Sequence, residues 1–352
     1  MISPVAIFVY NRVDNTQQTV QALLRNTLAK ETDVYVFSDG GKNEESWKRV
    51  NEVRAYLHEV KREVEANGGL RSITLIERPE NIYLERNIIE GIAYVLDRHD
   101  TVIVLEDDIV TSPYYLEYMN EAFDMYRDEK RVMHVAGFTN LDLLSSSNEW
   151  KGSETYFTAH MSGWGWGTWK DRWQTHFHHY ETEEEALEGM TEADINAIQY
   201  DGVFPCLKSL KKQPIPWDIC WEMEIYKAGG LCLTPAHTMV RNIGLQNGTH
   251  FRAYSILQHY EFDREPLQRK LKLEKQVPEK NPDIELLFKD AIRDWGIRYT
   301  WLGKVVRWGY KKIKASAKPK LTEKGFGNRS LQRRAKDKTG LAKKGVGKTE
   351  DY

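Results

Sequence analysis

The chain has 352 residues, of which 41% are hydrophobic and 29% are charged, and this composition indicates a soluble globular protein with a sizeable core. The formal net charge of −2 hides an asymmetry, because residues 303–352 contain 16 Lys and Arg against four Asp and Glu. The longest apolar run near the N-terminus, residues 5–10, is too short to span a bilayer and no basic stretch precedes it. We therefore expect neither a signal peptide nor a transmembrane helix.

Strands and helices alternate along the first third of the sequence. The apolar, β-branched runs that predict strands cover residues 4–10, 33–40, 71–78 and 101–107. The amphipathic patterns that predict helices cover residues 15–29, 44–65 and 85–98. This alternation predicts an α/β fold with a mostly parallel sheet flanked by helices.

Polar residues follow each of these predicted strands. They are Asn11 and Arg12, Ser38 and Asp39, Arg78 and Asn81, and the run Glu106 to Asp108. Any one of them alone reads as a solvated loop residue. Four groups in succession indicate a site, because ligands of open α/β sheets bind where the strands end.

The run Glu106-Asp107-Asp108 directly follows the apolar strand pattern "TVIVL". Three adjacent carboxylates repel one another unless a cation neutralises them. Hard oxygen ligands in a loop suit Mn²⁺ or Mg²⁺, which commonly share their other ligands with substrate phosphates. Because no Gly-rich phosphate loop with Lys and Ser/Thr is present, the acids favour a nucleotide diphosphate sugar over phosphoryl transfer.

Aromatic residues dominate the middle of the chain. Residues 160–173 contain four Trp and three Gly, and aromatic rings can stack on sugar faces. A Trp-rich core is the alternative for these rings. The His-rich run 176–180 lacks acids or cysteines at ligand spacing, so we do not expect a metal there. Cys206, Cys220 and Cys232 likewise lack metal spacing and indicate buried thiols in a reducing compartment.

Five short segments carry a resemblance to a known family: "AIFVYNR", "VFSDGG", "VLEDDIVTSPYYLEYM", "GWGWGTW" and "PWDICWE". In this order they resemble the GT-A glycosyltransferases, most closely the family of N-acetylglucosaminyltransferase I, of which this chain looks like a bacterial-type relative. The resemblance covers roughly residues 3–255, and its most specific part is "LEDD" followed by an aromatic-rich helix. It implies a Rossmann-like GT-A fold.

The resemblance also assigns roles to the residues at the strand ends. It implies that Asp108 is the direct ligand of Mn²⁺ or Mg²⁺, with Glu106 and Asp107 orienting the nucleotide sugar and the metal's water shell. Arg12 and Asp39 would hold the nucleoside, Asp39 through the base. The third-strand region has no obvious match, so Asn81 and Arg86 are added as further nucleotide-sugar contacts on position alone.

A second set of candidates lies on the acceptor side. The resemblance implies that Asp218 is the catalytic base, although an Asp after Pro216 and Trp217 also suits a helix N-cap. Trp164, Trp166 and Trp217 are candidate acceptor contacts. The segment 242–251 loosely resembles a closing loop, in which His250 is a candidate contact or else a surface histidine.

These assignments lead to a metal-dependent, inverting glycosyltransferase. The expected donor is a UDP-sugar such as UDP-N-acetylglucosamine, and the expected acceptor is a glycan or lipid-linked sugar of surface polysaccharide synthesis. A sugar-phosphate nucleotidyltransferase is one alternative, although it would need a Gly-rich basic segment that "VYNRVDNTQQ" lacks. A non-catalytic carbohydrate-binding protein is the other.

We expect a glycosyltransferase domain over residues 1–260, divided into a nucleotide-sugar half (1–130) and an acceptor half (131–260). A helical extension (261–314) and a basic, disordered tail (315–352) would follow. Residues 301–314 combine Trp and Lys/Arg at helical spacing, which suits an anionic membrane surface. A merely solubilising tail is the alternative, and nucleic acid is not expected because the rest of the chain is acidic. The predicted location is the cytoplasm, at the inner face of the membrane.

Overall fold

A computed structural model describes residues 2–139, 141, 152–202, 206–244 and 264–289 of the chain. The chain divides into two compact units, Met1–Gly296 and Ile297–Tyr352, and all described residues belong to the first. The predicted membrane helix at 301–314, the tail at 315–352 and His250 therefore lie outside the described residues. Among the described residues, no helix combines the length and apolar character that crossing a bilayer requires.

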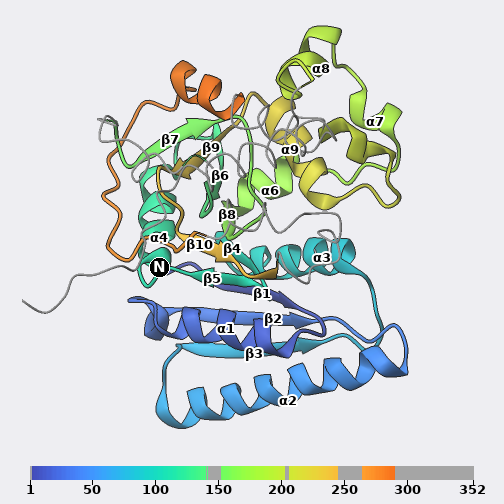
Figure 1. Cartoon of the computed structure of the whole chain (residues 1–352), viewed down its shortest axis with the longest axis vertical. Coiled ribbons are helices and arrows are strands. Elements are labelled where there is room, and N and C mark those ends of the chain that lie inside the picture. Colours follow the sequence, from blue (N-terminus) through green and yellow to red (C-terminus); the bar gives the residue numbers. More distant parts are fainter. Residues whose placement is uncertain (1, 140, 142–151, 203–205, 245–263, 290–352) are drawn as a thin grey trace, which may run out of the picture. The chain divides into compact units, whose positions relative to one another are not determined.

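The first third of the fold alternates strands and helices as predicted (Figure 1). Its elements are β1 (Val5–Val9), α1 (Val13–Leu24), η1 (Ala29–Glu31), β2 (Asp33–Ser38), α2 (Glu44–Asn67), β3 (Ser72–Glu77), α3 (Leu84–Leu96) and β4 (Thr101–Glu106). The four strands end within two residues of their predicted ends. Helix α2 begins at a reciprocal capping box, in which Asn43 accepts from the Ser46 N–H and Ser46 Oγ accepts from the Asn43 N–H.

The elements that follow are shorter and less regular. They are β5 (Ile109–Thr111), α4 (Tyr115–Met125), β6 (Val132–Ala136), β7 (Thr155–Thr158), β8 (Trp166–Trp169), α6 (Lys170–His176), α7 (Glu183–Leu187), α8 (Glu192–Ile198), η2 (Cys206–Lys211), α9 (Trp217–Lys227), β9 (Leu231–Pro235) and β10 (Val240–Asn242). A further helix covers residues 282–289.

Eight strands form one sheet in the order β3-β2-β1-β4-β8-β6-β9-β7. Strands β1 to β4 are mutually parallel, β8 runs antiparallel between β4 and β6, and β7 runs antiparallel to β9. The prediction of a mixed α/β fold with a largely parallel sheet flanked by helices is thus confirmed. Strands β5 and β10 pair separately as a two-stranded antiparallel ribbon just after the acidic run.

Both faces of the sheet are covered, which explains why its inner strands β1 and β4 are almost entirely apolar. In β1, Val5, Ile7 and Val9 pack in the core shared with α1, α2 and α4, whereas Ala6 and Phe8 pack in the core shared with α3 and α9. The alternation follows from the two-residue period of a strand. The sheet is consequently the middle of three layers and a rigid support for loops at its edge.

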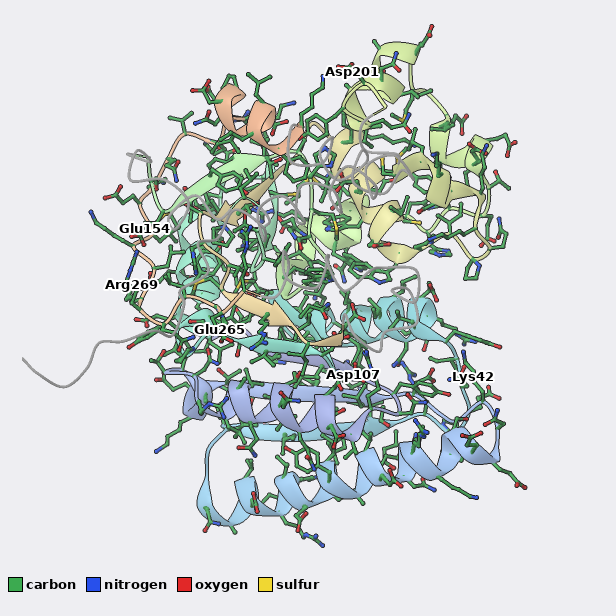
Figure 2. All side chains as sticks on the ribbon, in the orientation of Figure 1. Lys42, Asp107, Glu154, Asp201, Glu265 and Arg269 are labelled. Atoms are coloured by element: carbon green, nitrogen blue, oxygen red, sulfur yellow. The ribbon has the colours of Figure 1, made fainter. Side chains whose placement is uncertain are left out.

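Residues 264–289 pack along the rest of the first unit and are tied to it at several points. Ser112 Oγ donates to the Leu267 carbonyl oxygen at 2.5 Å, and Lys270 forms ion pairs with Glu117 and Glu121. Arg269 contacts Glu154, and both are labelled in Figure 2. These contacts join the segment to the sheet and α4, while the domain boundary expected at residue 260 stays a prediction. Cys206, Cys220 and Cys232 are free and buried, as predicted.

Candidate functional site

Strands β1, β2, β3 and β4 end at the same level of the sheet. Phe8 of β1 lies opposite Glu106 of β4, Val9 lies opposite Ser38 of β2, and Ser38 lies opposite Glu77 of β3. The polar residues that follow these strands are therefore brought to one edge, as the sequence pattern indicated.

The acidic run contacts Arg12 at this edge; Asp107 is labelled in Figure 2. The Arg12 guanidinium donates from both Nη2 and Nε to the Asp107 carboxylate, and its Nη2 lies 2.9 Å from Asp108 Oδ2. The Thr19 hydroxyl donates to the Asp107 carbonyl oxygen at 2.9 Å. Arg12 thus supplies one cation that makes the acidic run tolerable, a contact that the sequence reasoning missed when it assigned Arg12 to the nucleoside.

Glu106 is the acid that Arg12 does not reach. Its side chain is half-buried and makes no hydrogen bond or ion pair within the described part of the chain. Burial raises the pKa of Glu106 well above its ordinary value, and the charges of Asp108 and Asp107 add to the shift. Burial also raises the pKa of Asp107 to about 6, although Arg12 opposes the shift. The ionised form of the acidic run is therefore disfavoured although Arg12 is present, and a further cation bound there would stabilise it.

The chain after β10 packs directly on the acids. The Ile243 N–H donates to the Asp108 carbonyl oxygen at 2.9 Å. A Cβ atom at Gly244 would lie 1.9 Å from Asp108 Oδ2, so a larger residue there would displace the Asp108 carboxylate. Sequence reasoning included Gly244 in a possible closing loop without linking it to Asp108. The remainder of that predicted loop, residues 245–251, lies outside the described residues.

Asp39 and Asn81 meet at the ends of β2 and β3. Asn81 Nδ2 donates to Asp39 Oδ2 at 2.7 Å, and Asp39 Oδ1 accepts from the Gly40 and Ile82 N–H groups at 2.9 Å each. Asp39 is 5% exposed, so its carboxylate mainly joins the two loops. Gly40 allows this close approach, because a Cβ there would lie 2.3 Å from the Glu80 carbonyl carbon.

Arg54, on α2, supports the same corner and was not singled out by the sequence. Its guanidinium donates to the Ser38 hydroxyl at 3.1 Å, to the Arg78 carbonyl oxygen at 2.7 Å and to the Asp39 carbonyl oxygen at 3.4 Å. Nothing in the local pattern of α2 marks this residue, since a lone Arg on an amphipathic helix reads as a solvated side chain. Its role appears only when α2 is placed against the strand ends.

Arg86 lies on the outer surface of α3. Its side chain is 67% exposed and its Nε lies 2.6 Å from Glu90 Oε1, one helical turn away. In this structure it makes no contact with Asp39, Asn81 or the acidic run. By contrast, Tyr83 is 60% exposed beside Asn81, with φ at 67° and the Lys42 ammonium 4.7 Å from its ring centre.

Asp218 is the second residue of α9, whose N-cap is Pro216 without a side-chain cap. Its Oδ1 accepts a hydrogen bond from the Ile219 N–H at 2.9 Å, so it stabilises the first turn without being the N-cap residue. Burial raises the pKa of Asp218, and its charge in turn raises the pKa of Glu106. The two carboxylates, from β4 and α9, therefore lie close enough to interact electrostatically.

The three candidate tryptophans differ in exposure. Trp166 is fully buried and stacks between His134 at 5.0 Å and Trp217 at 5.2 Å. Trp217 is itself only 5% exposed. The rings of Trp166 and Trp217 thus lie in the aromatic core, the alternative left open for them, and Trp166 has no ring face open to a sugar. Trp164 is half-buried against Phe138, 4.5 Å away, and retains exposed surface.

The acidic run offers oxygen ligands for a divalent cation but not a complete set. No cluster of three or more His, Cys, Asp or Glu side chains within the described ranges has the geometry of a complete metal site. Glu106 and Asp108 are nevertheless hard oxygen donors, and no described residue forms a hydrogen bond or ion pair with the Glu106 carboxylate. Such a pair fits a Mn²⁺ or Mg²⁺ ion that takes its remaining ligands from a diphosphate and water, and does not fit an all-protein cage.

Comparison with known proteins gives only distant similarity. No protein-family model matches the chain, and no curated protein matches it. The mannosyltransferase PcManGT from Pyrobaculum calidifontis, solved with GDP-Man and Mn²⁺, is 13% identical with a TM-score of 0.44, over 90% of this chain and 81% of that one. TarS residues 1–349 from S. aureus, solved with UDP-GlcNAc, is 12% identical with a TM-score of 0.34, over 50% of this chain and 47% of that one.

A UDP-glucose pyrophosphorylase solved with UDP-glucose is 10% identical with a TM-score of 0.34, over 67% of this chain and 90% of that one. Transferases of both predicted classes are therefore among the similar structures. Likeness at this level leaves the reaction to be decided by the chemistry of the site. The resemblance to the N-acetylglucosaminyltransferase I family stays a prediction.

Proposed function

We propose that this protein is a metal-dependent glycosyltransferase that moves a sugar from a nucleotide diphosphate donor to a hydroxyl acceptor. One observation carries the proposal: the acidic run after β4 lies at the same edge as Arg12 and the Asp39–Asn81 corner, and Asp218 of α9 is close enough to influence Glu106. A nucleotide site, a diphosphate site and a separate carboxylate for the acceptor are what such a transfer needs.

Different residues of the chain would bind the nucleoside, bind the diphosphate and accept the proton. The Asp39–Asn81 corner holds the nucleoside end, with Tyr83 exposed beside it as an additional surface. Arg12 holds Asp107 and Asp108 in place and adds positive charge where the diphosphate would lie. Asp218 accepts the proton of the attacking hydroxyl, and its raised pKa makes it a stronger base than an exposed aspartate.

Asp108, with Glu106 beside it, would hold Mn²⁺ or Mg²⁺. When bound, the cation supplies Lewis-acid stabilisation of the diphosphate leaving group. Because attack by the hydroxyl opposite this leaving group inverts the anomeric centre, we propose an inverting displacement. UDP-N-acetylglucosamine is the first donor to test, with a glycan or lipid-linked sugar as acceptor.

A panel of nucleotide sugars tests the proposal, scored by Mn²⁺-dependent release of the nucleoside diphosphate. We expect one donor to be turned over and EDTA to stop the reaction. Release of pyrophosphate from a nucleoside triphosphate and a sugar phosphate would instead identify a nucleotidyltransferase. Glycan binding without turnover of any donor would identify a non-catalytic binding protein.

We further propose that the basic C-terminal segment brings the enzyme to an anionic membrane surface, where a lipid-linked acceptor would lie. The support is sequence alone: 16 Lys and Arg within residues 303–352, each worth roughly 1 kcal/mol near anionic lipid. The full chain should sediment with anionic liposomes at low salt and less so at high salt. A chain ending at Asp294 should remain in solution and still hydrolyse donor; equal partitioning of the two would contradict the proposal.

A further inference from the structure

Glu222 is the exception among the buried residues of α9. The other five, Trp217, Cys220, Trp221, Met223 and Ile225, are uncharged side chains of the core. Glu222 is only 5% exposed. Because burying a carboxylate costs free energy unless it is hydrogen-bonded, its presence on this face requires an explanation.

Both oxygens of Glu222 are held by the turn that follows β7. Oε1 is hydrogen-bonded to His160 Nδ1, and Oε2 accepts from the Met161 N–H at 2.8 Å. His160 is itself 7% exposed, with its ring 4.5 Å from that of Tyr200 and 5.3 Å from that of Phe288. The carboxylate is therefore fixed, and it joins α9 to residues 160–161.

Asp218 lies four residues before Glu222 on the same helix. Residues at this spacing lie on one face, a single turn apart. The other charged or titratable groups that influence Asp218 are Lys212, Glu106 and the Cys220 thiol. After burial, which is the largest cause, the negative charge of Glu222 contributes to raising the pKa of Asp218, and Lys212 opposes it.

We propose that Glu222, fixed by His160 and the Met161 N–H, is a positioning residue for Asp218. It ties the second turn of α9 to the loop after β7, and it keeps a negative charge one turn from the carboxylate that accepts the acceptor proton. The inference rests on the proposed role of Asp218 as the base. The simpler alternative is a cross-link that stabilises α9 and does nothing to Asp218.

Glu222→Gln separates these alternatives, with Glu224→Gln as the matched control. Glu224 lies on the same helix and accepts a hydrogen bond from the Tyr180 hydroxyl, away from Asp218. In metal-free protein, the carboxyl pKa of Asp218 is measured by carbon NMR, its signal being identified by its loss in Asp218→Asn. We expect Glu222→Gln to lower this pKa by about half to one unit, the direction expected when a like charge is removed, and Glu224→Gln to leave it unchanged.

Kinetics supply the second readout. In Glu222→Gln the acid limb of the kcat profile should move to lower pH with the donor KM unchanged, and a cross-link alone would not move it. An Asp218 pKa that is the same in Glu222→Gln and the wild type would overturn the inference. A full rate in Asp218→Asn would instead refute the base assignment, while the NMR titration would still report whether Glu222 acts on Asp218.

His160 provides an independent arm if Glu222→Gln does not fold. His160→Ala should reduce kcat by about tenfold, the low end for removing a supporting hydrogen bond. His160→Asn, which keeps a donor near the Nδ1 position, should restore kcat to within about threefold of the wild type. Equal loss in both variants, with the Asp218 pKa unchanged, would show that His160 acts through packing alone and would contradict the proposal.

Discussion

The two halves of the large sheet treat charged side chains in opposite ways. In the β1–β4 half, the charged residues lie at or beyond the strand ends, and Arg12 contacts Asp107 and Asp108 at the edge of the sheet. In the half built from β6 to β9, titratable groups lie inside the fold: His134 is fully buried within β6, and Glu222 is buried on α9, hydrogen-bonded to residues 160 and 161. Charged groups thus gather at the edge of the first half and are enclosed within the second.

This difference predicts that substitutions in the first half change activity, whereas substitutions in the second half change stability. A strand-end carboxylate contributes little to the core, so its removal should alter chemistry without unfolding the protein. A ring or a titratable group in the aromatic core contributes to packing, so its removal should alter stability first. Substitutions in each half can test this expectation.

Asp108→Asn should have the largest effect. It keeps the size of the side chain but removes the charge proposed to hold the cation, whose contribution of several kcal/mol corresponds to a loss of turnover of about 10³-fold or more. Removing one like charge from the acidic run should leave the melting temperature unchanged or raise it in metal-free protein. Full Mn²⁺-dependent activity in this variant would refute the assignment of Asp108.

Trp166→Ala should lower the free energy of unfolding by about 3 to 5 kcal/mol, the usual cost of removing a buried large aromatic residue. The reason is that Trp166 is completely buried between His134 and Trp217. Urea unfolding measures the change, with Trp164→Ala as the half-buried control. If Trp166→Ala lost donor turnover while keeping its stability, the ring would belong to the site, and the expectation that core residues act on stability first would be wrong.

The β1–β4 half could be predicted from sequence because its signals are local. Each apolar run ends in polar residues, and parallel strands align those ends, so Arg12, Asp39 and Asp108 could be placed at one edge before the fold was known. What each side chain contacts there could not be predicted. The pairing of Arg12 with the acids depends on the register of β1 against β4, which no local pattern specifies.

The second half was harder for a different reason. A run of Trp and Gly has the same composition whether its rings face a sugar or one another, so burial alone separates Trp166 from Trp164. Glu222 was missed because its partner His160 lies 62 residues earlier, on another element. A helical pattern with one acid among apolar residues does not reveal which side of the helix is covered.

His134→Phe should remove part of the pH dependence of stability. Burial lowers the pKa of His134 to about 3, with a backbone group of Ser162 weakly opposing, and neither ring nitrogen has a well-formed hydrogen bond within the described structure. An unfolded chain takes up this proton near pH 6.5, so stability is lost as the pH falls from about 6.5 towards 3. The loss should reach about 2 kcal/mol at pH 5.

Because Phe keeps a ring that can stack on Trp166, the free energy of unfolding of His134→Phe should differ little from that of the wild type at pH 8. Denaturant unfolding of the two proteins at pH 8 and pH 5 gives the difference directly, because the other titrating groups are common to both. A wild type and variant that lose equal stability between these pH values would show that His134 does not titrate as its burial implies.

Arg86→Ala should have the smallest effect, and it tests how far the strand-end site extends. Sequence position suggested a nucleotide contact, yet the side chain is 67% exposed and paired with Glu90 on the surface of α3. An exposed pair one helical turn apart contributes little to stability and is screened by salt. We therefore expect no measurable change in the free energy of unfolding and a donor Kd within about twofold of the wild type, as for other surface substitutions.

Isothermal titration with the donor identified by the nucleotide-sugar panel measures this Kd, with Arg12→Ala as the comparison at the acidic run. A tenfold loss in Arg86→Ala would mean that Arg86 turns from Glu90 towards the donor, and that the site extends from the strand ends onto α3.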